Sequence, residues 1–223
     1  MAAILDIKEQ FFVNNQISAD TFPTKIYYEG DETLLYNKRR VSVVGSRKVS
    51  DLGKRRTQYI TEMLIKHDVI IVSGMAEGVD TIAHRTALNN GHTIAVLGTS
   101  LNQVYPKSNA DLFEIIKKDH LAISQFSANY PLQKKNFPQR NHTMPLISDA
   151  TIIIEATEKS GTRHLGWEAL RLGRNLYILE NVVQSTNWAK EMIQYGAVML
   201  TNKMLESAIE EIPYATSKFE YEF

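Results

Sequence analysis

The chain has 223 residues and a formal net charge of zero, because 25 Lys and Arg residues are matched by 25 Asp and Glu. Its 43% hydrophobic and 22% charged residues are typical of a globular protein. Its neutral net charge argues against a protein that coats nucleic acid through bulk positive charge, so any anion site must be local. The sequence contains no cysteine, which excludes thiol chemistry. It also shows no secretory signal and no apolar run near the roughly 20 residues that a membrane span needs, so we expect a cytoplasmic protein with no membrane partner.

The first 40 residues lack the regular pattern of the rest of the chain. A short helix followed by Ile26-Tyr27-Tyr28 predicts an extra edge strand or a flap. We therefore expect residues 1–40 to be an N-terminal extension packed on the core rather than a separate domain.

From residue 41 onward, short β-branched runs alternate with stretches that have apolar residues at helical spacing. The predicted strands are 41–45, 69–74, 93–98, 151–155 and 176–180, with weaker candidates at 121–126 and 197–200, and the predicted helices are 51–67, 78–90, 108–118, 162–173 and 187–195. Nearly continuous apolar runs are typical of parallel strands that are covered on both faces. This order predicts an α/β, Rossmann-like domain over residues 41–211, with a mainly parallel doubly wound sheet and helices on both faces.

The remaining residues, 212–223, are rich in Tyr, Phe, Lys and Glu and have no clear period. We expect them to form a C-terminal tail that is partly disordered.

Three turns with similar chemistry follow predicted strands. They are Gly45-Ser46-Arg47, Ser73-Gly74 with Gly78, and Ser160-Gly161-Thr162. A glycine lets the backbone approach an anion, a hydroxyl donates to it, a guanidinium binds it bidentately, and the helices that follow aim free N–H groups at it. Because ligands of open parallel sheets bind beyond the carboxyl ends of the strands, we expect the three turns to form one phosphate-binding crevice.

Several enzyme classes are not favoured by these turns. The glycine order is neither the dinucleotide fingerprint Gly-x-Gly-x-x-Gly nor a Walker motif, and strand-to-helix turns favour Gly and Ser for conformational reasons alone. Asp80 and His84 are four residues apart. We interpret Asp80 as a carboxylate that caps or hydrogen-bonds the turn, and His84 as a partly buried histidine whose hydrogen bonds are satisfied. The histidines lack ligand spacing, so we predict no metal, no other cofactor and no catalytic residue.

A second candidate element is the segment from Lys134 to Asn141. Lys134, Lys135 and Arg140 flank Phe137 in a stretch that Pro131 and Pro138 make irregular. This pattern suits a nucleic-acid strand whose phosphates contact the cations while a base stacks on the ring. The alternative is that Phe137 fills the core beneath a loop.

Taken in order, these segments resemble the DprA/Smf family. The matching residues are Val43-Val44-Gly45-Ser46-Arg47, Ser73-Gly74, Gly78-Val79-Asp80, Ala83-His84, Thr93 to Gly98, Tyr105-Pro106, Phe137-Pro138, Arg140-Asn141, Ser148-Asp149-Ala150 and Ser160-Gly161. The resemblance covers about residues 41 to 200. It implies an extended Rossmann-like fold, a homodimer, binding and protection of incoming single-stranded DNA, and delivery of the RecA recombinase onto that DNA in natural transformation.

The resemblance also implies residue roles. Gly45, Ser46 and Arg47 would hold a phosphate, Lys134 or Lys135 would contact the backbone, and Phe137, Arg140 and Asn141 would line the path of the strand. Two departures from the family pattern bear on these roles: His142 replaces an arginine, which removes a phosphate contact, and Glu180 with Asn181 replaces Pro-Gly, which places an acid near the crevice. They weaken the inference of recombinase loading more than that of DNA binding.

Two other classes of function stay open. Gly161-Thr162-Arg163 followed by Glu168 is similar to a turn of LOG-type nucleotide phosphoribohydrolases, and related folds sense nucleotides. Such an enzyme would need Glu168 or Glu180 over a ribose as a general acid or charge stabiliser. A purely structural interaction module is the least favoured, and the choice among DNA, RNA and a mononucleotide as ligand is also open.

Overall fold

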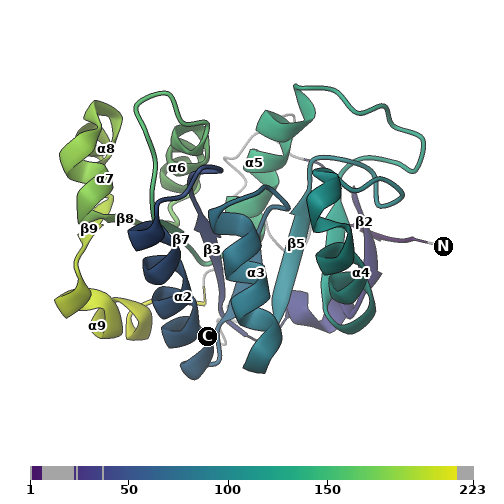
Figure 1. Cartoon of the computed structure of the whole chain (residues 1–223), viewed down its shortest axis with the longest axis horizontal. Helices are drawn as coiled ribbons and strands as arrows, with labels where there is room; N and C mark the ends of the chain where they lie inside the picture. Colours follow the sequence, from purple (N-terminus) through teal and green to yellow (C-terminus); the bar gives the residue numbers. More distant parts are fainter. Residues whose placement is uncertain (1, 7–22, 24, 37, 215–223) are drawn as a thin grey trace, which may run out of the picture.

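The computed structural model describes residues 2–6, 23, 25–36 and 38–214, which form one nine-stranded sheet with helices on both faces (Figure 1). The parallel strands are β3 (Arg40–Val44), β4 (Ile70–Ser73), β5 (Thr93–Leu97), β6 (Leu121–Ser124), β7 (Ala150–Ile153), β8 (Asn175–Leu179) and β9 (Val198–Leu200). The strand order is β1-β2-β6-β5-β4-β3-β7-β8-β9. The predicted Rossmann-like α/β class is therefore confirmed.

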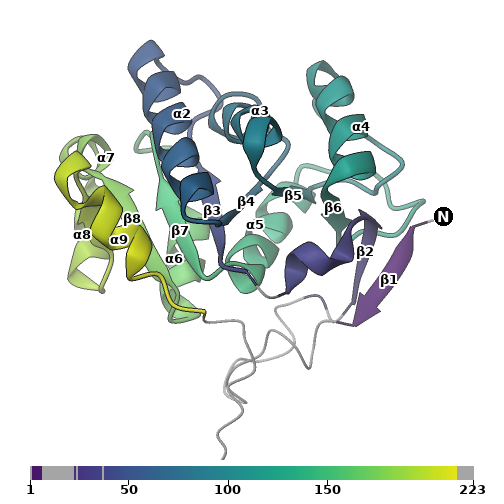
Figure 2. The same ribbon diagram turned by 90° about the horizontal axis from the view of Figure 1, so that it is seen from below.

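The helices fall into two layers, as the view from below shows (Figure 2). They are α2 (Asp51–Lys66), α3 (Val79–Asn90), α4 (Ala110–Asp119), α5 (Asn136–Ile147), α6 (Thr162–Arg171), α7 (Glu180–Ser185), α8 (Asn187–Gln194) and α9 (Leu205–Glu210). The core side chains place α2, α3, α4 and α9 on one face of the sheet and α5, α6, α7 and α8 on the other. Each strand and helix predicted from residue 41 onward is present, with helix ends shifted by at most two residues.

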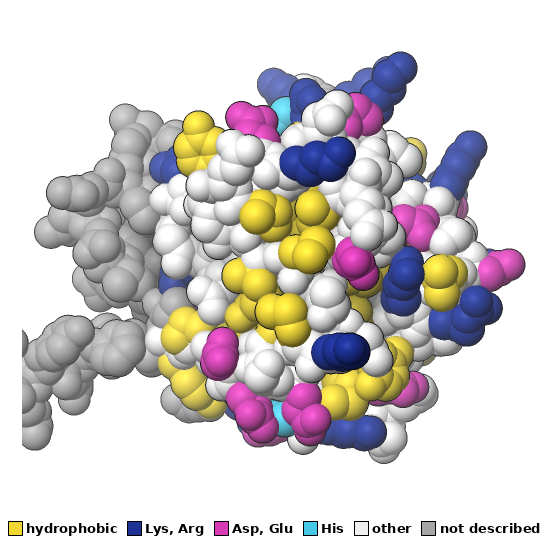
Figure 3. Space-filling view, turned by 90° about the vertical axis from the view of Figure 1, so that its left-hand side faces the viewer, with side chains coloured by type: hydrophobic (Ala, Val, Ile, Leu, Met, Phe, Trp, Pro, Cys, Tyr) yellow, Lys and Arg dark blue, Asp and Glu magenta, His cyan; other side chains and the backbone are white. Residues whose placement is uncertain are grey.

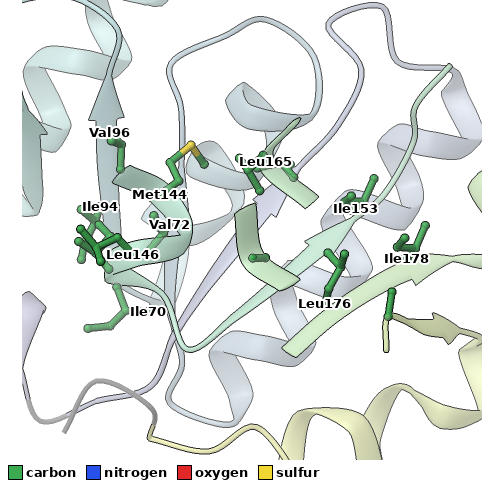
Figure 4. Close-up of a cluster of buried hydrophobic side chains, with 14 of the residues drawn as sticks. Ile70, Val72, Ile94, Val96, Met144, Leu146, Ile153, Leu165, Leu176 and Ile178 are labelled. Atoms are coloured by element: carbon green, nitrogen blue, oxygen red, sulfur yellow. The ribbon is translucent and has the colours of Figure 1, made fainter. Parts of the chain in front are cut away.

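Alternation along the strands divides the core between the two faces. Ile70 and Val72 of β4 pack toward α5 and α6, together with Met144 of α5 (Figure 4), while Ile71 packs with Leu64 of α2 on the opposite face. Every residue of β3 to β7 is buried, which explains why these strands read as continuous apolar runs.

Three helices were not predicted from the sequence, and the largest of them is α5. The segment from Lys134 to Asn141 was expected to be irregular, but the chain is helical from Asn136. Pro138 lies in the first turn, where its missing N–H needs no intrahelical partner, and Pro145 lies near the carboxyl end of the helix. The shorter helices α7 and α9 were also missed.

The described part of the N-terminal extension completes one edge of the sheet. Strand β2 (Lys25–Gly30) pairs antiparallel with β6, and β1 (Ala3–Asp6) pairs antiparallel with β2. The extra strand expected at Ile26-Tyr27-Tyr28 is thus present, but among the described residues β1 rather than this strand forms the edge of the sheet. The short helix expected before it falls largely on residues 7–22, outside the described residues, and Ala3–Asp6 is a strand.

The expected tail from 212 lies mostly outside the described residues too, but Ile212 itself is buried in the core. Among the described residues, no helix combines the length and the apolar character that crossing a membrane requires.

The strand order reverses next to β3. Strand β3 leads to β4 on one side, whereas its other neighbour, β7, comes much later in the chain. Such a switch point opens a crevice beyond the carboxyl ends of the two strands, and this is where open α/β sheets bind ligands.

Candidate functional site

A pocket of about 720 Å³ occupies this crevice at the carboxyl ends of β3 and β7. Its lining includes Gly45, Ser46, Arg47, Lys48, Ala76, Asp80, Tyr105, Lys134, Phe137, Pro138, Arg140, Asn141, Thr157, Ser160, Gly161, Thr162 and His164. The first and third predicted turns therefore meet in one pocket with the segment that begins at Lys134. We call it the switch-point pocket.

The loop after β3 is fixed by Glu155, which follows β7. The backbone N–H of Ser46 donates to the carbonyl oxygen of Glu155 at 2.7 Å, and the Glu155 carboxylate accepts from the N–H and hydroxyl of Ser50 at 2.9 and 2.5 Å. A Cβ on Gly45 would lie 2.8 Å from the same carbonyl oxygen, so this position requires glycine. Glu155 thus occupies the amino end of α2 and leaves Arg47 exposed at the pocket rim.

Gly78 holds the other side of this loop. Its φ of 81° favours glycine, and a Cβ there would lie 2.2 Å from the carbonyl oxygen of Ser46. The N–H of Val79, the first residue of α3, donates to that oxygen at 3.2 Å. The amino end of α3 was expected to bind phosphate, but Gly78 does not line the pocket and the helix end binds the protein's own backbone instead.

Ser73 and Gly74 also have structural contacts in place of the predicted phosphate. The buried Ser73 hydroxyl donates to the carbonyl oxygen of Val43 at 2.7 Å, which ties β4 to β3. Gly74 is covered by the Arg140 guanidinium, because a Cβ at Gly74 would lie 1.7 Å from Arg140 Nη1. Neither residue lines the switch-point pocket.

His84 is a satisfied histidine, although it is fully rather than partly buried. Its Nε2 is 2.7 Å from the carbonyl oxygen of Gly74, and its Nδ1 is 2.7 Å from the hydroxyl of Thr93. Both ring nitrogens are therefore engaged within the core.

Asp80 and Arg140 form a buried pair of opposite charges at the pocket floor. Arg140 Nη1 donates to the carbonyl oxygen of Val96 at 2.9 Å, and its Nε donates to the side chain of Asn141 at 3.1 Å. Burial raises the pKa of Asp80 to about 6 against the opposing charge of Arg140, and burial lowers the pKa of Arg140. Arg140 lines the pocket as predicted, but its guanidinium also joins α5 to β5.

Two aromatic rings stand above this floor. Phe137 is half-buried against Gly98, where a Cβ would lie 2.6 Å from the ring, and the Arg47 guanidinium carbon is 5.8 Å from the ring centroid. The centroid of Tyr105 is 5.4 Å from that of Phe137, and Tyr105 is 46% exposed. Sequence reasoning placed Tyr105 only in the family pattern, although an exposed aromatic that follows a strand could have identified it as a site residue.

The lysines and the third turn differ in how far they reach the pocket. Lys134 lines it, whereas Lys135, which is also exposed, does not. At the amino end of α6, the Ser160 hydroxyl donates to Thr162 Oγ1 at 2.9 Å, and both residues line the pocket. Gly161 has no heavy atom within 4 Å of its Cβ position, so packing does not require a glycine there.

Positive charge is concentrated in this pocket even though the chain is neutral. The described lining residues include the cations Arg47, Lys48, Lys134 and Arg140 and one carboxylate, Asp80. The local excess of positive charge, next to exposed aromatic surface, suits a ligand with phosphates and flat rings.

The carboxylates that a hydrolase would need lie elsewhere. Glu168 is buried, with its Oε1 2.6 Å from Arg171 Nη2 and its Oε2 3.0 Å from His142 Nδ1. Glu180, the acid expected near the crevice, accepts a hydrogen bond from Gln184 and lines a different cavity. Neither glutamate lines the switch-point pocket, and His142 does not line it either.

Comparisons with known proteins show which family this chain belongs to. Residues 3–212 match the family described as DNA recombination-mediator protein A. The chain is 37% identical over 177 residues to protein Smf of Synechocystis, covering 78% of this chain and 44% of that one. It is 34% identical over 183 residues to DNA processing protein DprA of Streptococcus pneumoniae, covering 81% and 64%. The chain thus spans about half the length of the curated relatives it matches.

Solved structures give the same result. A DprA structure from Helicobacter pylori, described for its single-stranded DNA binding mode, has a TM-score of 0.82 and 27% identity, covering 96% of this chain and 98% of that one. The DprA of S. pneumoniae has a TM-score of 0.76 and 33% identity, covering 86% and 68%. A molybdenum cofactor carrier protein of Chlamydomonas reinhardtii, at 14% identity and a TM-score of 0.54, shares the fold alone. Because the family match extends over nearly the whole chain, this chain belongs to the DprA/Smf family of DNA recombination-mediator proteins.

Proposed function

We propose that the switch-point pocket binds single-stranded DNA. The observation that carries this proposal is the gathering of Arg47, Lys48, Lys134 and Arg140 with an exposed aromatic ring in one pocket of an otherwise neutral chain. The binding of single-stranded DNA by the H. pylori relative supports the same assignment.

The pocket residues would divide the recognition of the strand between phosphate and base. Arg47 and Lys134, whose side chains are exposed at the rim, would contact phosphates, while Ser46, Ser160 and Thr162 offer hydroxyl groups nearby. The exposed ring of Tyr105, rather than the half-buried Phe137, would provide most of the stacking surface for a base. Lys135 would add only long-range attraction.

The test is binding of a labelled oligo-dT strand as salt is raised. We expect Arg47→Ala to weaken binding about 10- to 100-fold, as for loss of a charge-assisted hydrogen bond, and to reduce the slope of log K against log salt by about 0.7. Arg171→Ala is the matched control, because Arg171 is paired with Glu168 away from the pocket. Equal losses in the two variants, or no binding by the wild type at low salt, would refute the proposal. Duplex, RNA and mononucleotide ligands in the same assay decide among the ligand classes.

In the cell, the bound strand would be incoming DNA that the protein protects and on which it assists RecA loading during natural transformation, in the cytoplasm. The relatives named DNA processing protein DprA support this wider role. RecA-dependent strand exchange with and without the protein tests it, and an unchanged rate would count against it.

We also propose that the chain forms a homodimer through the β9 end of the sheet. Hydrophobic side chains gather on this end of the molecule (Figure 3), including Tyr195, Val198, Met199 and Met204, which are 66%, 38%, 38% and 41% exposed. Strand β9 pairs only with β8 among the described residues, so its outer edge is open to a second copy. A symmetric pair would cover both the edge and the apolar side chains.

A further inference from the structure

A second cavity, of about 180 Å³, lies between the middle of α2 and the carboxyl ends of β8 and β9. Its floor is apolar, because Ile60, Leu179, Leu200 and Leu205 are all buried. None of its lining residues belongs to the switch-point pocket. We call it the α2–β9 cavity.

Polar side chains without partners surround this apolar floor. Within the part of the chain that the structure describes, Arg56, Tyr59, Thr201 and Asn202 make no side-chain hydrogen bond or ion pair, and all four line the cavity. Tyr59 is 47% exposed, so a face of its ring is available to a ligand. Glu180, whose Oε1 is 3.1 Å from Gln184 Nε2, is the opposing negative charge at the rim.

The chemistry of the cavity points to one kind of ligand. Its volume is below the roughly 300 Å³ at which drug-sized ligand pockets begin, so it suits a single ring system. An apolar floor beside a tyrosine ring suits the flat face of a base. The hydroxyl and amide groups suit the polar edge of that base, and the arginine suits a phosphate. We infer that the α2–β9 cavity binds one nucleotide of the same single strand that occupies the switch-point pocket, an inference that rests on the proposed function.

The two sites lie within reach of one strand. Both are at the carboxyl edge of the sheet, and α2 begins next to the switch-point pocket, where Lys48 is part of the lining (Figure 1). From Asp51 to Arg56 the helix rises about 8 Å, a span that a few nucleotides cover. Lys48 in the lining of the first site and Arg56 in the lining of the second place a cation at each end of this route. The strand would therefore run from the switch-point pocket past the first turns of α2.

The experiment compares oligo-dT strands of about 3 and about 16 nucleotides, of which only the longer is expected to reach both sites. For the longer strand, we expect Tyr59→Ala to weaken binding about tenfold and Arg56→Ala about fivefold, with no change for the shorter strand. Arg55→Ala is the matched control, because it removes the same charge from the next residue, which is exposed and does not line the cavity. Glu180→Gln should strengthen binding of the longer strand, since it removes the opposing charge. Thermal melting checks that each variant is folded.

A second measurement locates the strand directly. Ultraviolet cross-linking of a 5-iodouracil oligonucleotide to the wild-type chain should label the peptide that contains Tyr59 with the longer strand and not with the shorter one. The inference is overturned if Arg56→Ala and Arg55→Ala cause equal losses at both lengths, if Tyr59→Ala binds the longer strand as well as the wild type, or if that peptide is never labelled. If Arg47→Ala still weakens binding more than Arg171→Ala in those cases, the proposed function survives and only the second site fails, whereas a wild type that binds neither strand overturns both.

Discussion

Two buried ionisable groups lie one turn apart on α3, at and below the pocket floor. Burial raises the pKa of Asp80 to about 6 from an ordinary value of 3.8, with Arg140 acting in the opposite direction. Burial lowers the pKa of His84 to about 4 from 6.5. At 1.36 kcal/mol per pKa unit, each difference corresponds to about 3 kcal/mol between the charged and neutral forms.

The two groups should have opposite effects on the free energy of unfolding as pH falls. Native Asp80 takes up its proton near pH 6, whereas in the unfolded chain it does so near pH 3.8, so acidification between these values stabilises the fold. Native His84 stays neutral until about pH 4, whereas in the unfolded chain it becomes charged near pH 6.5, so the same acidification destabilises the fold. In the wild type the two contributions nearly cancel.

Asp80→Asn removes only the first contribution. We expect its free energy of unfolding to fall relative to the wild type by about 2 kcal/mol between pH 7 and pH 4, whatever the difference at pH 7. The measurement is urea denaturation followed by circular dichroism at several pH values.

Asp111→Asn serves as the control for this measurement. Asp111 is exposed and its pKa is lowered by the hydrogen bond and charge of Arg85, so the relative stability of this variant should change in the opposite direction. Parallel pH profiles for the wild type and Asp80→Asn would refute the argument, because they would mean that Asp80 titrates alike in the folded and unfolded chains.

The remaining predictions concern the strand and the dimer. Tyr105→Ala should weaken binding of oligo-dT about tenfold and leave the binding of an abasic strand unchanged, because only oligo-dT has bases to stack on the ring. Fluorescence anisotropy titrations measure both affinities, and equal losses for the two strands would exclude stacking on this ring. Val198→Glu should place two like charges across the proposed dimer contact and shift light scattering from dimer to monomer, and a dimer that persists unchanged would assign the contact to another surface.

The strands were predictable because their physical cause is local. A strand that is covered on both faces needs apolar, β-branched residues at every position, and β3 to β7 meet this requirement. Helix α5 was not predictable for the converse reason. It carries Pro138 and Pro145, and most of its residues from Arg140 to Ile147 are buried, so it shows neither a helix-forming composition nor an amphipathic period.

The site was predictable only in part, because the role of a glycine depends on distant residues. Gly45 and Gly78 both follow strands and look alike in the sequence, and each accommodates a backbone carbonyl of the protein itself. The partner of Gly78 is Ser46, and the group that covers Gly74 is Arg140, more than 60 residues away in the chain. No local pattern distinguishes room for a phosphate from room for another part of the fold.

A carboxylate in a pocket for phosphates would repel them, but the contacts of Arg140 account for its presence. Because that guanidinium is buried while it joins α5 to β5, it needs a nearby counter-charge, and Asp80 provides one. The two charges largely offset each other, so the positive charge available to a ligand comes from Arg47, Lys48 and Lys134, which all lie on loops. The affinity for a strand should therefore depend less on the buried cation than on how firmly Gly78 and Glu155 hold the loop that carries Arg47 and Lys48.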